Sequence, residues 1–212
     1  MRIRKEQGYW LNGQKIIFRN KQSRVVMQTD EVPLLGQHNI ANVMASIATA
    51  HYLGISLKTI RQRVKSFRGV PERLETIRKI RHRTFIDDTT ATSPEATECA
   101  LKSVERPVVL IAGGTNKGLN YEKLAKTVTQ AVHYCILLPG SATKLIIKQF
   151  KLKGFKRYIG PVRSMKAAVA QAIKNAPAHS TILLSPGAAS FGLFKNEFDR
   201  GRQFTAIVRN LK

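Results

Sequence analysis

Cysteine, aromatic residues and long apolar runs are all scarce in this sequence. Two cysteines among 212 residues exclude a disulfide scaffold and a cysteine-rich zinc module. No apolar run approaches the roughly 20 residues of a membrane-spanning helix, and no apolar stretch follows the charged first residues as it does in a signal peptide. We therefore expect a soluble protein of a reducing cytoplasm with no membrane partner.

Acidic residues are also few. The chain carries 36 lysines and arginines against 13 aspartates and glutamates, which gives a formal net charge of +23. Such a charge is typical of proteins that bind nucleic acid or another anionic surface. The basic residues are spread evenly along the chain, however, and aromatic residues that could stack on bases make up only 7%. We do not expect a nucleic-acid partner, and a basic nucleic-acid-binding module remains the alternative.

The chain is predicted to fold as two parts that meet near residue 72, after the chain-breaking segment Gly69-Val70-Pro71. Hydrophobic residues make up 43% of the sequence, enough to bury a core. In the first part we predict a hairpin or short meander over residues 9–28. Two helices follow, one over residues 39–53 and one that Ser56 can cap.

Beyond residue 72, short strands alternate with helices. This alternation predicts an α/β fold with a doubly wound, mostly parallel sheet and right-handed crossovers. The expected strands cover residues 74–80, 84–86, 107–112, 134–138, 156–159 and 181–184, and the expected helices start at Ser93-Pro94 or cover residues 121–131, 141–150, 163–175 and 194–211. Because ligands of such sheets bind at the carboxyl ends of the strands, we expect the site in the loops that follow them.

Three of these loops carry residues that could bind a ligand. Residues 85–94 place two carboxylates and four hydroxyls before a helix whose free N–H groups favour an anion. Residues 112–118 combine glycines, which allow close backbone approach, with Lys117 as a point charge for a carboxylate or phosphate. Small residues in the segment 183–201 leave room for a ligand. The alternatives are ordinary capping, a plain strand-to-helix turn and tight packing of small residues.

Asn39 and Asn42 lie three residues apart and would share a face of the first helix. Paired amides could read the edge of an adenine or a ribose. The alternative is that Asn39 caps the helix while Asn42 is solvated. The histidines have no ligand spacing, so we predict no metal site, and we expect Cys99 and Cys135 to be buried.

Five segments, taken together and in order, resemble the Mur ligase family from about residue 36 to the end of the chain. They are GQHNIAN (36–42), GVPERLE (69–75), FIDDTTATSPEAT (85–97), VLIAGGTNKG (109–118) and LLSPGAASFGLFKNEFDRG (183–201). The last segment is the most specific. It resembles the family members that add D-glutamate, because other Mur ligases differ there.

The resemblance implies a Rossmann-like C-terminal domain over residues 73–212. Residues 1–72 would be the C-terminal remnant of the central domain, which holds the ATP P-loop. The implied activity is an ATP-dependent ligase that adds D-glutamate to UDP-N-acetylmuramoyl-L-alanine through an acyl-phosphate intermediate, in peptidoglycan synthesis. ATP and Mg²⁺ would take part, and catalysis would rest on positioning and charge neutralisation.

The resemblance also implies roles for particular residues. Asn42 would contact the nucleotide, Arg73 would lie by the ATP phosphates, and Asp88 would lie by the ribose. The D-glutamate carboxylates would be held by Thr92, Lys117 and Ser190. Phe191 would also lie at the D-glutamate site. The sequence departs from the family's usual residues at three positions, where a lysine, a histidine and an aromatic residue are replaced by Thr90, Glu72 and Glu197.

The length of the chain limits what it is expected to do alone. A complete family member is about twice as long, and this sequence has no Gly-Lys-Thr/Ser phosphate-binding loop. We expect a separate ligase half to supply the P-loop, the UDP-binding domain and the catalytic and metal-binding residues. A non-catalytic remnant that binds an amino acid, a nucleotide or nucleic acid is the alternative. A folate-type glutamate ligase shares the architecture, and the last segment argues against it.

Overall fold

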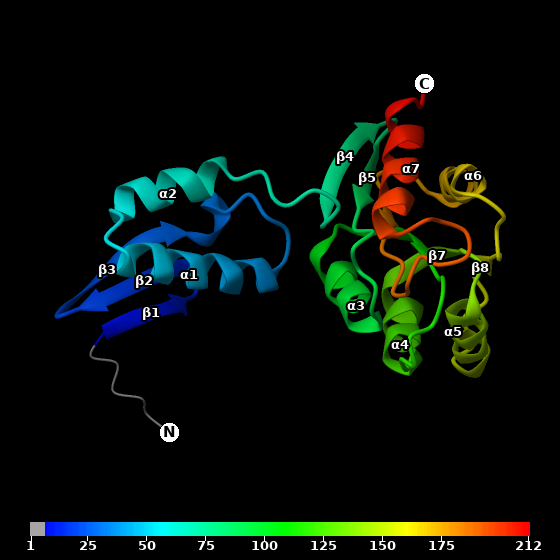
Figure 1. The fold of residues 1–212 in the computed structure, drawn as a ribbon, viewed down its shortest axis with the longest axis horizontal. Helices are drawn as coiled ribbons and strands as arrows, with labels where there is room; N and C mark the ends of the chain where they lie inside the picture. The colour runs from blue at the N-terminus through cyan, green and yellow to red at the C-terminus, as the bar shows by residue number, and fades with distance from the viewer. Residues whose placement is uncertain (1–6) are drawn as a thin grey trace. The chain divides into compact units, whose positions relative to one another are not determined.

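The computed structural model describes residues 7–212. Contacts within the chain divide it into two compact units, one ending at Gly69 and one running from Val70 to Lys212. Figure 1 shows both units with their labelled elements. None of the helices described in this range is long and apolar enough to cross a lipid bilayer.

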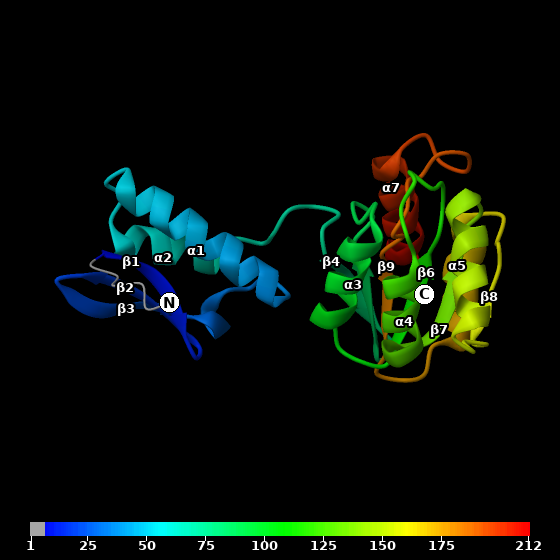
Figure 2. The same cartoon turned by 90° about the horizontal axis from the view of Figure 1, so that it is seen from below.

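The first unit is an antiparallel meander covered by two helices. Its strands are β1 (Gln7–Asn12), β2 (Lys15–Asn20) and β3 (Gln22–Gln28), and its helices are α1 (Gln37–Tyr52) and α2 (Leu57–Ser66), with a short 3-10 turn η1 (Thr29–Glu31) between sheet and helices. Figure 2 shows both helices on one side of this sheet. The Ser56 hydroxyl accepts a hydrogen bond from the Thr59 N–H and caps α2, as predicted.

The core of this unit lies between the sheet and the two helices. It is built from apolar side chains of β2, β3, α1 and α2 that are almost completely buried, among them Ile16, Phe18, Met27, Ile47 and Ile60. The predicted meander and both helices are therefore confirmed. The first helix begins at Gln37, two residues earlier than predicted, and Gly36 is its N-cap residue.

The second unit contains a six-stranded sheet in the order β4-β5-β9-β6-β7-β8. Strand β4 is antiparallel to β5, and the other pairings are parallel, which confirms the predicted α/β fold with a mostly parallel sheet. The strands are β4 (Glu75–Ile80), β5 (Arg83–Asp87), β6 (Val108–Ala112), β7 (Val132–Leu137), β8 (Tyr158–Ile159) and β9 (Thr181–Leu184). All five residues of β6 are buried, as its apolar run predicts.

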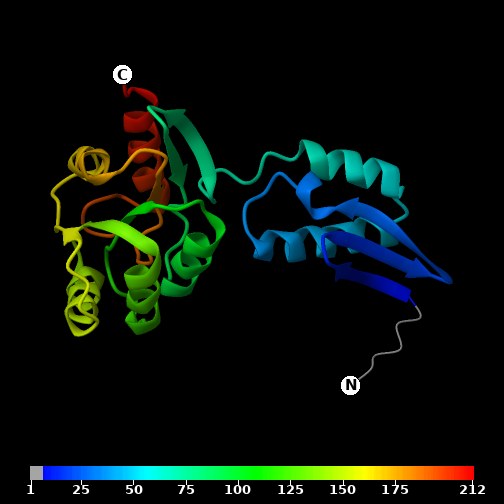
Figure 3. The ribbon, with the colours of Figure 1, turned by 180° about the vertical axis from the view of Figure 1, so that it is seen from behind.

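Helices cover both faces of this sheet. One apolar core joins the sheet to α3 (Pro94–Ser103), α4 (Glu122–Ala131) and α5 (Ser141–Leu152). The other joins its opposite face to α6 (Met165–Asn175) and α7 (Glu197–Arg209). Figure 3 shows the sheet and the helices on its two faces from behind. Ser93 caps α3 through the Ala96 N–H, and Pro94 occupies the first turn, as predicted.

Two expectations were wrong in detail. The last helix begins at Glu197 rather than near residue 194, because the Asn196 side chain accepts the Asp199 N–H and caps it there. Cys99 is exposed on α3, whereas Cys135 is fully buried in β7. The apolar face of α3 is formed by other residues, Ala100 and Leu101, so Cys99 is left facing solvent.

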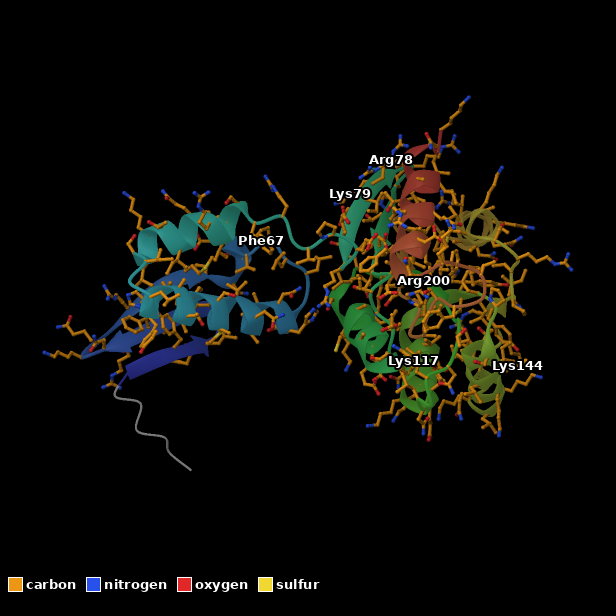
Figure 4. The ribbon with its side chains drawn as sticks, viewed as in Figure 1. Phe67, Arg78, Lys79, Lys117, Lys144 and Arg200 are labelled. Carbon is orange, nitrogen blue, oxygen red and sulfur yellow. The ribbon has the colours of Figure 1, made fainter. Side chains whose placement is uncertain are left out.

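The carboxyl end of α7 is held by an arginine from the first strand of the sheet. Figure 4 labels this residue, Arg78. Its Nη1 donates to the carbonyl oxygens of Val208, Arg209 and Leu211, at 3.5, 2.7 and 2.8 Å. Val208 and Arg209 lie in the last turn of α7, where the helix supplies few N–H donors, and Leu211 lies just beyond it.

We expect Arg78→Ala to destabilise the second unit by about 1–2 kcal/mol, since it removes charged donors from the end of α7. Urea unfolding followed by far-UV circular dichroism measures this. The one tryptophan, Trp10, lies in the first unit, so its fluorescence transition should not move. The exposed neighbour Lys79 provides the control, and equal effects of Lys79→Ala and Arg78→Ala would contradict the assignment.

Candidate functional site

Three loops meet at the carboxyl edge of the six-stranded sheet. We call them the aspartate loop (residues 88–93, after β5), the glycine loop (residues 113–118, after β6) and the serine loop (residues 185–196, after β9). Because β9 lies between β5 and β6 in the sheet, the serine loop is flanked by the other two. These are the loops in which the sequence predicted a site.

Backbone hydrogen bonds join the serine loop to both neighbours. The Gly187 N–H donates to the Ala91 carbonyl of the aspartate loop at 2.9 Å. On the other side, Thr115 and Ala189 exchange two hydrogen bonds of 2.8 and 3.0 Å and form a short antiparallel bridge. The three loops therefore form one connected layer, and a displacement of one moves the others.

Gly114 is needed for this bridge to form. Its φ of +142° is a conformation that side-chain-bearing residues rarely adopt, and a Cβ at this position would overlap the Ala189 carbonyl. A glycine of this loop does allow close backbone approach, as the sequence predicts. The group that approaches Gly114 is the serine loop of the protein itself.

The aspartate and glycine loops also meet through side chains. The Lys117 ammonium lies 3.4 Å from the Thr92 hydroxyl, at the outer edge of hydrogen-bond distance. Lys117 is exposed and Thr92 is half-buried, so both can reach a ligand. Figure 4 shows Lys117 at the end of the unit opposite to Lys79.

The remaining two predicted substrate residues lie on the serine loop. Ser190 is 4% exposed, whereas its neighbour Phe191 is 60% exposed. The Thr115 hydroxyl donates to the Phe191 carbonyl at 2.7 Å, which fixes this part of the serine loop on the glycine loop. The structure thus places the four residues on three loops that are hydrogen-bonded to one another: Thr92, Lys117, Ser190 and Phe191.

Asp88 lies deeper than a ligand-contacting residue usually does. It is 7% exposed, and its two oxygens accept hydrogen bonds from the Leu74 N–H at 3.2 Å and the Ser185 hydroxyl at 2.7 Å. Burial raises the pKa of Asp88 to about 6, against the opposing effect of these donors and of Arg73. In this structure Asp88 joins β9 to the turn that carries Arg73.

That turn presents Arg73 to solvent. Its neighbours Glu72 and Leu74 have φ values of +65° and +45°, which are uncommon outside glycine. Thr90 holds the turn in place, because its hydroxyl donates to the Glu72 carbonyl at 3.0 Å. Two of the three departures from the family's usual residues, Thr90 and Glu72, are therefore direct neighbours.

Asn42 lies in the first unit, on the exposed side of α1. Its amide donates to the Asn39 side-chain oxygen at 3.3 Å, and the Asn39 amide donates to the Leu35 carbonyl at 2.8 Å. The predicted pairing of the two amides is confirmed. Gly36 rather than Asn39 precedes the helix, so Asn39 is not its N-cap residue.

Arg200 is the residue of this region that sequence reasoning missed. It is completely buried on α7 and donates to the Thr89 carbonyl at 2.7 Å, the Thr89 hydroxyl at 2.9 Å and the Ala188 carbonyl at 3.1 Å. Burial lowers the pKa of its guanidinium to about 10. A sequence signal does exist: Arg200 precedes Phe204 and Val208 at intervals of four, so it lies on the apolar face of the helix.

A second buried ionisable residue, Asp87, is the last residue of β5 and directly precedes the aspartate loop. It accepts the Thr89 N–H at 2.9 Å and the Thr205 hydroxyl at 3.3 Å, and burial raises its pKa to about 7. Gly201 packs beside it: a Cβ there would lie 2.6 Å from the Thr89 methyl group and 3.0 Å from an Asp87 carboxylate oxygen. Small size, rather than backbone freedom, is what this position requires.

The second unit is therefore a doubly wound α/β domain whose candidate site lies at the carboxyl edge of its sheet. The sequence profile described as the Mur ligase, glutamate ligase domain matches residues 72–187, and the chain belongs to this family. It is 37% identical over 205 residues to the UDP-N-acetylmuramoylalanine--D-glutamate ligase of Roseiflexus sp. strain RS-1. That alignment covers 95% of this chain and 44% of the relative, so the chain spans less than half of that protein's length.

Solved structures share the fold. MurF from Acinetobacter baumannii matches with a TM-score of 0.65 at 17% identity, over 95% of this chain and 44% of that one. Folylpolyglutamate synthase from Mycobacterium tuberculosis matches with a TM-score of 0.65 at 13% identity, over 96% of this chain and 48% of that one. At these identities the likeness concerns the fold alone.

We expect Arg200→Ala to destabilise the second unit by about 3 kcal/mol, because buried carbonyl and hydroxyl groups lose their donor. Arg202→Ala is the matched control, since Arg202 is exposed on the same helix. Urea unfolding of both variants measures the difference. If the two variants unfold alike, the guanidinium of Arg200 does not hold the loops together.

The stability of the second unit should also depend on pH. The pKa values of Asp87 and Asp88 are raised in the folded unit, so the folded state binds their protons more tightly than the unfolded chain does. This stabilisation is complete below about pH 4 and is lost as the pH rises through about 6 and 7. We expect the urea midpoint of the unit to fall between about pH 5 and about pH 8.

Asp87→Asn tests the cause, because the neutral amide cannot titrate. The variant should show a smaller fall of the urea midpoint over the same pH range, and Trp10 fluorescence, which reports the first unit, should show no change between variant and parent. An unchanged pH dependence in Asp87→Asn would show that this carboxyl titrates normally.

Proposed function

We propose that the chain forms the C-terminal part of a cytoplasmic ligase that adds D-glutamate to UDP-N-acetylmuramoyl-L-alanine in peptidoglycan synthesis. The observation that carries the proposal is the meeting of Lys117 and Thr92 at 3.4 Å on two loops of the candidate site. A cation and a hydroxyl donor converging at a solvent-accessible edge suit the carboxylates of an acidic amino acid.

The serine loop supports the same assignment. Ser190 would add a hydroxyl donor, and the exposed ring of Phe191 would cover the aliphatic part of D-glutamate. Both lie on the loop that is bridged to the glycine loop through Thr115, so the amino acid would bind to a preformed layer. Preformed polar groups lose less conformational freedom on binding.

The nucleotide is proposed to contact Arg73 and Asn42. The exposed guanidinium of Arg73 suits the ATP phosphates, and the fixed turn around it would orient the group. The Asn42 amide would contact the nucleotide from the first unit. Asp88 would then act through the turn it holds, or accept from the ribose with its remaining lone pairs. ATP would supply the phosphoryl group that activates the acceptor carboxylate.

The rest of the machinery would come from outside the residues of this chain. In the part that the structure describes, no three His, Cys, Asp or Glu side chains gather as a metal site, so Mg²⁺ would be held by the P-loop-containing part. That part would also bind the UDP-sugar substrate. This chain's contribution would be to position D-glutamate, to neutralise its carboxylates and to exclude water from the reacting groups.

A folate-type substrate is not favoured. The similarity to folylpolyglutamate synthase concerns the fold, at 13% identity, whereas the Roseiflexus relative that carries D-glutamate ligase in its name is 37% identical. The identity, together with the residues of the serine loop, is why D-glutamate is the proposed amino acid.

A chimaera tests the proposal: this chain replaces the corresponding C-terminal part of the Roseiflexus relative, and phosphate release is measured. We expect release that requires both D-glutamate and UDP-N-acetylmuramoyl-L-alanine. Lys117→Met should raise the KM for D-glutamate about 10- to 100-fold, because a charged hydrogen bond to the carboxylate is lost.

The matched control is Lys144→Met, since Lys144 is exposed on α5. It should leave the KM for D-glutamate unchanged. A folded chimaera that releases phosphate without dependence on D-glutamate, or a Lys117→Met variant with the parental KM, would contradict the assignment.

A further inference from the structure

A basic cavity lies at the opposite edge of the six-stranded sheet from the candidate site. Its volume is about 350 Å³, and its lining comes from the β4–β5 turn, from Glu105 before β6 and from residues 179–181 at the start of β9. The candidate site follows the carboxyl ends of these strands, whereas the cavity lies at the amino ends of β5 and β9. The two places are therefore separate.

The lining of the cavity is strongly cationic. Lys79, Arg81 and Arg83 contribute three permanent positive charges, and Glu105 is the one carboxylate among the lining residues. The imidazole rings of His82 and His179 face each other with their centroids 5.0 Å apart. The positive charges of Lys79, Arg81 and Arg83 repel one another around the same cavity, and an anion bound there would relieve that repulsion.

One of the positive groups, Arg83, is held in place by the backbone. The Arg83 guanidinium is fixed, because its Nε and Nη2 donate to the Ala176 carbonyl at 3.2 and 2.8 Å. The Thr84 N–H donates to the Ser180 carbonyl at 3.0 Å and ties the end of the β4–β5 turn to the start of β9. The Arg83 side chain and the backbone of this sheet edge are thus preorganised.

The chemistry of the lining selects the ligand. An apolar molecule would have to displace water from the charged groups, which is costly. A metal ion finds no group of three suitable side chains in the described residues. A phosphate-bearing anion matches the guanidinium and ammonium groups, and the cavity is larger than a single phosphate requires, at about 350 Å³.

We propose that this cavity, lined by Lys79, Arg81, His82, Arg83 and His179, binds a polyphosphate group, either free or carried by a nucleotide. This cavity shares no residue with the proposed D-glutamate site. The cavity gives part of the +23 net charge of the chain a specific ligand.

Isothermal titration of the full chain with sodium tripolyphosphate at physiological ionic strength tests the proposal. We expect saturable binding at one site. The double variant Lys79→Gln/Arg81→Gln removes two exposed cations of the cavity and should weaken binding at least fivefold. The same titration with ATP separates the two sources of the group: equal affinity indicates recognition of the polyphosphate alone, and tighter binding indicates that the nucleoside is also contacted.

The matched control removes two exposed cations elsewhere in the same unit, in the double variant Lys144→Gln/Lys148→Gln on α5. It should change the affinity less than twofold. Figure 4 shows Lys79 and Lys144 far apart on the second unit. Amide NMR shifts locate the ligand, and those of Arg81, His82 and His179 should move, while those of the glycine loop should not.

Three results would overturn the proposal. The first is the absence of saturable binding by the parent chain. The second is an equal loss of affinity in both double variants, which would mean diffuse attraction to a basic protein. The third is a set of NMR shifts confined to Arg73 or to the glycine loop, which would place the anion at the candidate site instead.

Discussion

The candidate site depends on the hydrogen bonds that the buried guanidinium of Arg200 donates. Arg200 reaches from α7 into the sheet edge and donates to Thr89 of the β5 end and to Ala188 of the serine loop. No carboxylate of the described residues lies within ion-pair distance of it, so its charge is stabilised by these carbonyl and hydroxyl oxygens together with the more distant carboxylates of Glu197 and Asp87. Such a cation is stable only while these oxygens stay in place. The loops depend on Arg200 in turn, because the same hydrogen bonds fix the loops that supply the oxygens.

From this anchor the order of the site spreads outward. The serine loop, held by Arg200, forms the bridge with the glycine loop at Thr115 and Ala189, and the glycine loop carries Lys117 to Thr92. On the other side, Asp88 connects Ser185 to the turn that presents Arg73. Lys117, Phe191 and Arg73, which are proposed to touch ligands, are exposed, whereas Arg200 and Asp88, which hold the loops around them, are buried. This division is what a preorganised site requires.

Much of the fold follows from local sequence, and the parts that do not have physical reasons. The apolar run of β6 and the capping pair Ser93-Pro94 predicted their elements correctly, because burial and capping are read from neighbouring residues. The start of α7 was placed too early, since the Asn196 cap competes with the apolar residues before it. The hydrogen-bond partners of Arg200 could not be predicted, because they lie 111 and 12 residues away in the chain. The substrate residues were predicted from the resemblance and stay a prediction. Their approach across three loops depends on strand order, which local sequence does not specify.

The most direct test of the account is an amide NMR titration of the full chain with D-glutamate, with L-glutamate as the control. We predict saturable shifts of Thr92, Lys117, Ser190 and Phe191 with D-glutamate and much weaker ones with L-glutamate. Shifts of the same size with both enantiomers, or shifts that avoid the three loops, would contradict the assignment of this sheet edge as the D-glutamate site.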